Sequence, residues 1–142
     1  MAEIRVFFSY PKNLVLLLAR LVLAYGFSMP ALMKFENIGG TAEWFASISI
    51  PFPSLMAYLV TGIETLGIVF LTLGLFTRYI SLFLSCVMIG AIFFVHGPNG
   101  YSLAQNGIEI PLYYLLFLLI FIFYGPGRFS LDSLLFKDGI YE

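Results

Sequence analysis

The chain has 142 residues, of which 61% are hydrophobic and 11% are charged, and its mean hydropathy is +0.97. A soluble domain usually has about 25% charged residues, so this chain is too poor in charge to cover a water-facing surface, and we predict an integral membrane protein. The net charge is −1 and the sequence has no lysine- or arginine-rich cluster, so nothing argues for nucleic acid as a partner.

Four apolar segments predict an all-α architecture within one domain over residues 1–142. The expected spans, in chain order, are residues 14–33, 54–76, 79–95 and 110–124, separated by segments rich in proline and glycine. The fourth is short for a bilayer that needs about 20 residues. No small-x-small cleavage site is evident near the N-terminus, so we expect the first span to be retained. The expected arrangement is a left-handed antiparallel four-helix bundle.

Two shorter helices are expected outside the spans. In the first long loop, Thr41 precedes an apolar stretch with Trp44 and Phe45, which predicts a short interfacial helix. In the C-terminal tail, Ser130 is the candidate N-cap of another.

Basic residues predict the orientation in the membrane. Lys34 alone flanks one side, whereas five basic residues flank the other: Arg5, Lys12, Arg78, Arg128 and Lys137. The positive-inside rule then predicts that both termini are cytoplasmic. We expect a multi-pass protein of the bacterial inner (plasma) membrane.

Two charges fall within the expected spans. Glu64 is the only charge of the second span, and Arg20 lies in the first. A charge at the bilayer centre costs roughly 2.5–3.5 kcal/mol on insertion scales, so such residues usually face inward and pair. Counted from the expected outer helix ends, at about 1.5 Å per residue, the two residues lie at similar depths, and we predict that they pair. The pair is either a structural salt bridge or part of a polar cavity.

A second polar group lies at the expected outer ends of the helices: Lys34, His96, Asn106 and Glu109. We predict that these four residues line one cavity that continues toward Glu64, because the bilayer penalises polar side chains that face lipid. The alternative is separate structural roles, in which His96 interacts with a helix C-terminus and Glu109 with a helix N-terminus.

The sequence carries no metal, flavin or haem signature. Cys86 is the only cysteine, so no disulfide within the chain is expected, and we interpret it as a packing residue. One cysteine and one histidine do not form a zinc or iron site.

Seven short motifs, in order and at consistent spacing, resemble those of the DoxX family of small four-span membrane proteins. They are Arg20-Leu21; Lys34-Phe35; Ala57-Tyr58 with Ile63-Glu64; Gly74-Leu75-Phe76-Thr77-Arg78; Phe94-Val95-His96-Gly97-Pro98-Asn99-Gly100; Asn106-Gly107-Ile108-Glu109-Ile110-Pro111; and Gly125-Pro126-Gly127-Arg128-Phe129-Ser130-Leu131-Asp132. One departure is Ser28-Met29-Pro30-Ala31, where the family commonly has His-Gly. The resemblance implies a role in membrane redox or thiol and sulfur metabolism.

The expected function is that of a quinone-interacting subunit of a membrane redox system, with Arg20, Lys34, Glu64, His96, Asn106 and Glu109 as ligand-binding residues. Its expected partners are the lipid bilayer, a quinone and a redox subunit that supplies electrons. The sequence leaves open whether the chain is itself catalytic and whether it forms a homo-oligomer. The alternative is a non-enzymatic scaffold or assembly factor that docks a partner protein. A small-solute transporter is disfavoured, because no inverted repeat is evident.

Overall fold

The computed structural model describes residues 2–135, and the side chains of residues 12–135; all regular structure in this part of the chain is helical. The elements are α1 (Ala2–Glu36), α2 (Ile38–Ser47), α3 (Pro53–Leu73), α4 (Thr77–Gly90), the π-helix η1 (Ala91–His96), the 3-10 helices η2 (Gly97–Asn99) and η3 (Leu103–Gln105), α5 (Glu109–Tyr124) and α6 (Leu131–Leu135). The all-α prediction is therefore confirmed here. Lys137 and the side chain of Arg5, on which the predicted orientation partly depends, lie outside the described residues.

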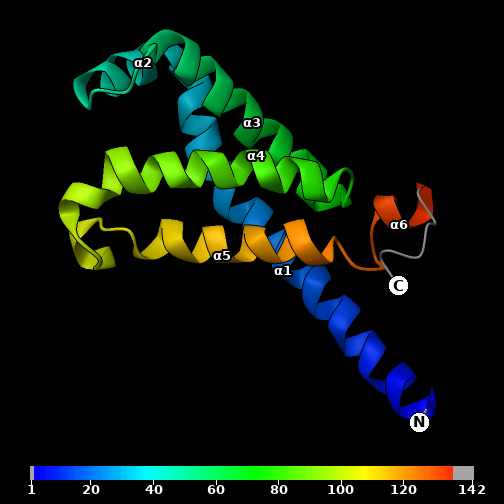
Figure 1. Ribbon diagram of the computed structural model, residues 1–142. Coiled ribbons are helices and arrows are strands. Elements are labelled where there is room, and N and C mark those ends of the chain that lie inside the picture. The colour runs from blue at the N-terminus through cyan, green and yellow to red at the C-terminus, as the bar shows by residue number, and fades with distance from the viewer. Residues whose placement is uncertain (1, 136–142) are drawn as a thin grey trace.

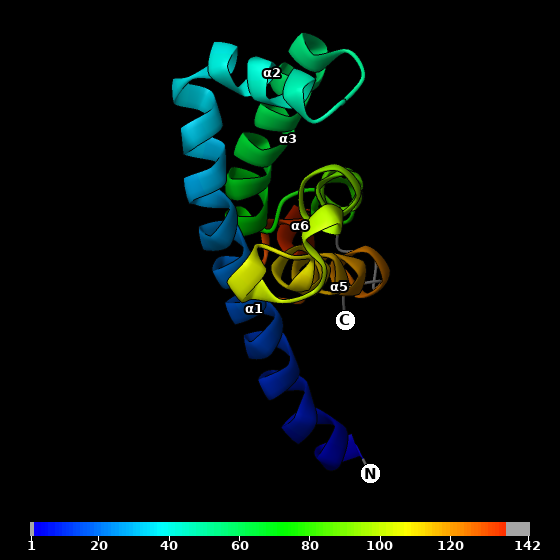
Figure 2. The ribbon, with the colours of Figure 1, turned by 90° about the vertical axis from the view of Figure 1, so that its left-hand side faces the viewer.

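The long helices form two antiparallel pairs that cross each other. α1 packs against α3, and α4 packs against α5 (Figure 1 and Figure 2). The helices form a bundle, as expected, but the α4–α5 pair runs across the α1–α3 pair instead of alongside it. The three-residue connection from α3 to α4 turns the chain sharply, because Gly74 and Phe76 have φ values of 69° and 48°, in the left-handed region.

Three helical segments are long and apolar enough to cross a membrane. They are Lys12–Glu36, Pro53–Leu73 and Thr77–Asn99, with 25, 21 and 23 residues. A bilayer needs about 20 residues, so the first three predicted spans are consistent with this result, although their ends shift. α5 is apolar but has only 16 residues. The count of four spans therefore stays a prediction.

A compact core lies where the two pairs cross. Leu23 and Phe27 of α1 pack there with Leu71 of α3, Leu84 of α4 and Phe121 of α5. By contrast, many large apolar side chains on the outer faces of these helices are exposed. Contact with lipid would remove these apolar side chains from water, which is favourable and agrees with the high hydrophobic content of the sequence. Fold and composition together indicate a helical membrane protein.

α2 is the short helix expected in the first long loop, but it begins earlier than predicted. Asn37 is its N-cap: the Asn37 side chain accepts a hydrogen bond from Gly40 N at 2.9 Å, and Asn37 O accepts one from Thr41 Oγ1 at 2.9 Å. Thr41 is therefore inside the helix and not at its start. Phe45 is buried, whereas Trp44 is exposed. The position of α2 at the membrane interface stays a prediction.

The second short helix, α6, begins where we expected. Ser130 Oγ accepts a hydrogen bond from Ser133 N at 3.2 Å and donates one to Gly127 O at 2.8 Å. Ser130 therefore satisfies a backbone N–H in the first turn of α6, as an N-cap does. The predicted cap is confirmed.

Gly67 and Gly62 of α3 differ in what a larger side chain would meet. A Cβ at position 67 would lie 2.8 Å from Leu84 Cδ1, and Leu84 is fully buried, whereas a Cβ at position 62 would meet no atom within 4 Å. We expect Gly67→Ala to lower the free energy of unfolding by about 1–3 kcal/mol through overpacking. Gly62→Ala is the matched control, which should leave it unchanged or raise it by up to about 1 kcal/mol. Unfolding in mixed detergent micelles measures both, and equal effects would contradict close packing at Gly67.

Candidate functional site

An ion pair joins α1 to α3 inside the protein. Lys34 Nζ lies 2.9 Å from Glu64 Oε2 and 3.3 Å from Glu64 Oε1. The side chain of Glu64 is 3% exposed and that of Lys34 is 17% exposed. Lys34 is in the last turn of α1, whereas Glu64 is in the middle of α3. Glu64, the charged residue of the second span, therefore forms an ion pair as expected, but its partner is Lys34 and not Arg20.

Arg20 does not pair with Glu64, so that prediction is wrong. The guanidinium of Arg20 is fully buried and binds three backbone carbonyls instead. Nη1 donates to Leu71 O at 2.8 Å, Nε donates to Pro126 O at 3.2 Å, and Nη2 donates to Phe129 O. Arg20 thus connects α1 to the last turn of α3 and to the segment between α5 and α6.

The direction of side chains on antiparallel helices explains this choice. The Cα–Cβ bonds of an α-helix tilt toward its N-terminus. α1 and α3 are antiparallel (Figure 1). The side chains of Arg20 and Glu64 therefore lean toward opposite ends of the pair and away from each other. Lys34 leans down α1 toward the middle of the pair, and Glu64 leans up α3 toward Lys34. The depths of Arg20 and Glu64 that we estimated from the sequence did not take this tilt into account.

Asp132 completes the structure around Arg20. Its two carboxylate oxygens accept hydrogen bonds from Phe76 N at 2.7 Å and Thr77 N at 2.9 Å, and Asp132 N donates to Gly74 O at 3.0 Å. The carboxylate therefore satisfies backbone N–H groups at the start of α4. We call Arg20, Asp132 and these backbone partners the Arg20–tail cluster. Asp132 was not among the residues expected from the sequence, although it ends the seventh motif, residues 125–132.

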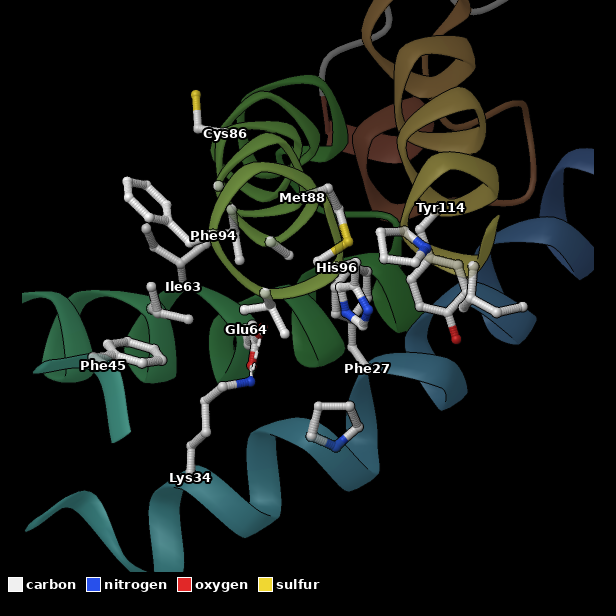
Figure 3. A pocket seen from close by; sticks show the side chains of 18 of the residues that line it. Phe27, Lys34, Phe45, Ile63, Glu64, Cys86, Met88, Phe94, His96 and Tyr114 are labelled. Carbon is white, nitrogen blue, oxygen red and sulfur yellow. Dashed lines mark hydrogen bonds and ion pairs between the residues drawn. The ribbon is translucent and has the colours of Figure 1, made fainter. Parts of the chain in front are cut away.

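A cavity of about 550 Å³ lies next to the ion pair, within the usual size range for small-molecule sites. Lys34, Glu64, His96 and Asn106 line it, as predicted, and Tyr114 also contributes to it. The remaining lining residues are mostly apolar and come from α1 to α5 and the connections between them (Figure 3). Four of the six predicted ligand-binding residues thus share one cavity. Ligand binding by these residues stays a prediction.

His96 stands at the end of a π-helical segment on this cavity. The segment Ala91–His96 continues α4 with wider turns, a geometry that is frequent at functional sites. His96 Nδ1 lies 2.8 Å from Asn106 O, and Asn99 Nδ2 donates to the same oxygen at 3.1 Å. Because a carbonyl oxygen only accepts, Nδ1 carries the hydrogen, which leaves Nε2 as the acceptor of the neutral ring.

Glu109 does not line the cavity, in contrast to our prediction. It is the first residue of α5, and its carboxylate accepts hydrogen bonds from Leu103 N at 2.8 Å and Tyr113 Oη at 3.1 Å. Glu109 therefore holds the loop before α5 in place. Its position agrees with the alternative interpretation, an anion at a helix N-terminus. Arg20 is likewise outside the cavity lining.

Apolar helices that can cross a membrane, with a buried ion pair and a histidine around an internal cavity, define a helical membrane protein with a polar internal site. The chain belongs to the DoxX family, whose sequence pattern matches residues 15–97. No solved structure is significantly similar to it.

Three relatives extend the similarity over most of the chain. The chain is 33% identical over 130 residues to an "Uncharacterized protein" of Haemophilus influenzae, which covers 86% of this chain and 83% of the relative. It is 31% identical over 121 residues to the "Putative oxidoreductase CatD" of Bacillus subtilis, with 85% and 87% covered. It is 27% identical over 135 residues to the "Inner membrane protein YphA" of Escherichia coli, with 88% and 93% covered.

Proposed function

We propose that this protein is a quinone-binding subunit of a membrane redox system. The observation that carries the proposal is the buried Lys34–Glu64 ion pair in the wall of a largely apolar cavity. An apolar pocket with a few convergent polar groups is the usual form of a small-molecule site. The name of the Bacillus subtilis relative, an oxidoreductase, supports the class of reaction.

The groups on the cavity fit the chemistry of a quinone ring. The ammonium of Lys34 has three hydrogens, of which two can point at the Glu64 oxygens, leaving a third to donate to a quinone carbonyl. Glu64 and His96 are groups that hold and release protons, which quinone reduction consumes. A bound quinone would supply the electron-accepting chemistry. Electrons would come from a partner redox subunit or from a substrate that reduces the quinone directly.

We infer four spans in the bacterial inner membrane, with α5 as the short fourth one. The Escherichia coli relative, which is named an inner membrane protein, supports the location. The positive-inside rule supports cytoplasmic termini, because Lys12, Arg78 and Arg128 lie on the side of the molecule opposite Lys34. The cavity would then be nearer the outer face.

The alternative function is a non-enzymatic scaffold. It is favoured by the fact that two of the expected ligand-binding residues, Arg20 and Glu109, bind the backbone of the chain itself. In that case the polar residues would hold the helices together and the exposed loops would dock a partner protein.

Quinone binding to the purified protein in lipid nanodiscs tests the proposal. We expect the wild type to bind decylubiquinone in native mass spectrometry, and His96→Ala to weaken binding about tenfold. Tenfold corresponds to about 1.4 kcal/mol, the size of one lost hydrogen bond. Tyr79→Leu is the control, because Tyr79 is exposed and does not line the cavity.

Equal losses in the two variants would mean that they act through stability alone. If the protein retains no quinone but co-purifies with a stoichiometric protein partner, the scaffold alternative holds instead.

A further inference from the structure

The cavity has two arms that differ in polarity. Viewed along α4, Phe45, Ile63, Cys86 and Phe94 lie on one side of this helix, and Phe27, His96 and Tyr114 lie on the other (Figure 3). Glu64 and Lys34 lie between the two sides. We call the first side the α2 arm, because Phe45 of α2 lies on it, and the second side the α5 arm, because Tyr114 of α5 lies on it.

The α2 arm is apolar. Beside Phe45, Ile63 and Phe94, its wall on α4 includes Phe83, Cys86 and Gly90. These three residues are at positions i, i+3 and i+7, which share one face of a helix. Apart from the ion pair and from Trp44, which precedes Phe45 in α2, the polar side chains of the cavity are instead on the α5 arm, where Tyr114 and His96 lie, with Asn106 bound to His96.

The cavity is lined by residues of α3 and α4 that are exposed on the surface of the molecule, within the apolar part of both helices. Leu59 of α3 and Phe83 of α4 line the cavity and are 47% and 53% exposed. Leu59 lies six residues from Pro53 and Phe83 lies six residues from Thr77, so each is about 9 Å along the axis from the start of its span, and the two starts are at opposite faces of the membrane. At that depth the surroundings of a membrane-spanning helix are hydrocarbon, so the arm opens to lipid.

We propose that the tail of the quinone lies in the α2 arm and that the ligand enters from the bilayer between α3 and α4. This inference rests on the proposed function. The ring lies against the Lys34–Glu64 pair and the α5 arm, where the polar partners are. A cavity of about 550 Å³ holds a drug-sized group, so most of a long isoprenoid tail must leave the cavity and extend into lipid. The α2 arm is the way out that leaves no charged group against the tail.

Gly90 allows this arm to be filled selectively. A Cβ at Gly90 would meet no atom within 4 Å, and Gly90 lines the cavity, so Gly90→Leu adds a side chain to open space in the α2 arm. Gly62→Leu is the matched control, because a Cβ there also meets nothing within 4 Å and Gly62 does not line the cavity. Both variants are compared with the wild type in nanodiscs with two quinones: duroquinone, which has no tail and no free ring carbon to react with Cys86, and ubiquinone-8.

We expect Gly90→Leu to weaken ubiquinone-8 binding at least tenfold and to change duroquinone binding less than twofold, with Gly62→Leu changing neither. Unchanged binding of ubiquinone-8 by Gly90→Leu, while the wild type binds both quinones, would overturn the tail position and leave the proposed function intact. Absence of binding of either quinone to the wild type would overturn both.

Cys86 provides a second measurement in the unaltered chain. It is exposed and lines the cavity, so it is not the packing residue that we expected. Because it is the only cysteine in the sequence, a lipid-soluble maleimide reports on this position alone. We expect ubiquinone-8 to slow alkylation of Cys86 severalfold and duroquinone, which has no free ring carbon to react with a thiol, to leave the rate unchanged. Equal alkylation rates with and without saturating ubiquinone-8 would contradict a tail in the α2 arm, even if Gly90→Leu does not fold.

Discussion

Replacing Arg20 with methionine should lower the free energy of unfolding by at least about 3 kcal/mol. The substitution leaves three carbonyls, those of Leu71, Pro126 and Phe129, without the donor that Arg20 provides. An unsatisfied buried polar group costs about 1–3 kcal/mol, so three of them outweigh the gain from removing a buried charge. It also removes the positive charge that interacts with Asp132, which holds the start of α4. Reversible unfolding in mixed detergent micelles measures the difference in unfolding free energy between the wild type and Arg20→Met.

Arg128→Gln is the matched control for this substitution. Arg128 is in the same C-terminal segment, but its side chain is exposed, so we expect a change within about 0.5 kcal/mol. If Arg20→Met were as mild as Arg128→Gln, the Arg20–tail cluster would not stabilise the fold. We also expect Arg20→Met to lower stability without weakening quinone binding per folded molecule, because Arg20 does not line the cavity.

Removal of either partner of the Lys34–Glu64 pair should cost about 3–5 kcal/mol, because the remaining charge is left buried and unpaired. Glu64 is nearly inaccessible, so Lys34→Met should be the more damaging single change. The double variant Lys34→Met with Glu64→Met should recover most of the stability, since replacing a buried ion pair with apolar residues is often neutral or stabilising. A double-mutant cycle of unfolding free energies measures this recovery.

The same double variant separates the stability of the pair from its function. If the pair binds the quinone ring, the double variant folds but loses quinone binding by at least tenfold. Lys12→Met is the control, because Lys12 is exposed at the opposite end of the described spans. A folded double variant that binds quinone as tightly as the wild type would exclude the pair as the ligand site and favour the scaffold alternative.

The sequence alone determined the class of this protein and most of its helices. Long apolar runs can only be buried in a bilayer or a core, and 142 residues with 11% charge have too few polar groups to enclose them. The same constraint marked Glu64 and Arg20 as residues that need partners. The cap of α6 by Ser130 also followed from local chemistry, because the residues that make a cap are adjacent in the chain.

The tertiary structure decided which partner each polar residue takes. Lys34 reaches Glu64 because side chains on antiparallel helices lean in opposite directions, and Arg20 binds carbonyls near the C-terminus, more than 100 residues away in the chain. Glu109 accepts a hydrogen bond from the loop that precedes α5, and only the folded conformation of this loop could reveal that contact. Spacing along one helix fixes depth and face, but not how two pairs of helices cross. The cavity beside Glu64 depends on that crossing, so the two arms of the cavity could not be predicted from the sequence.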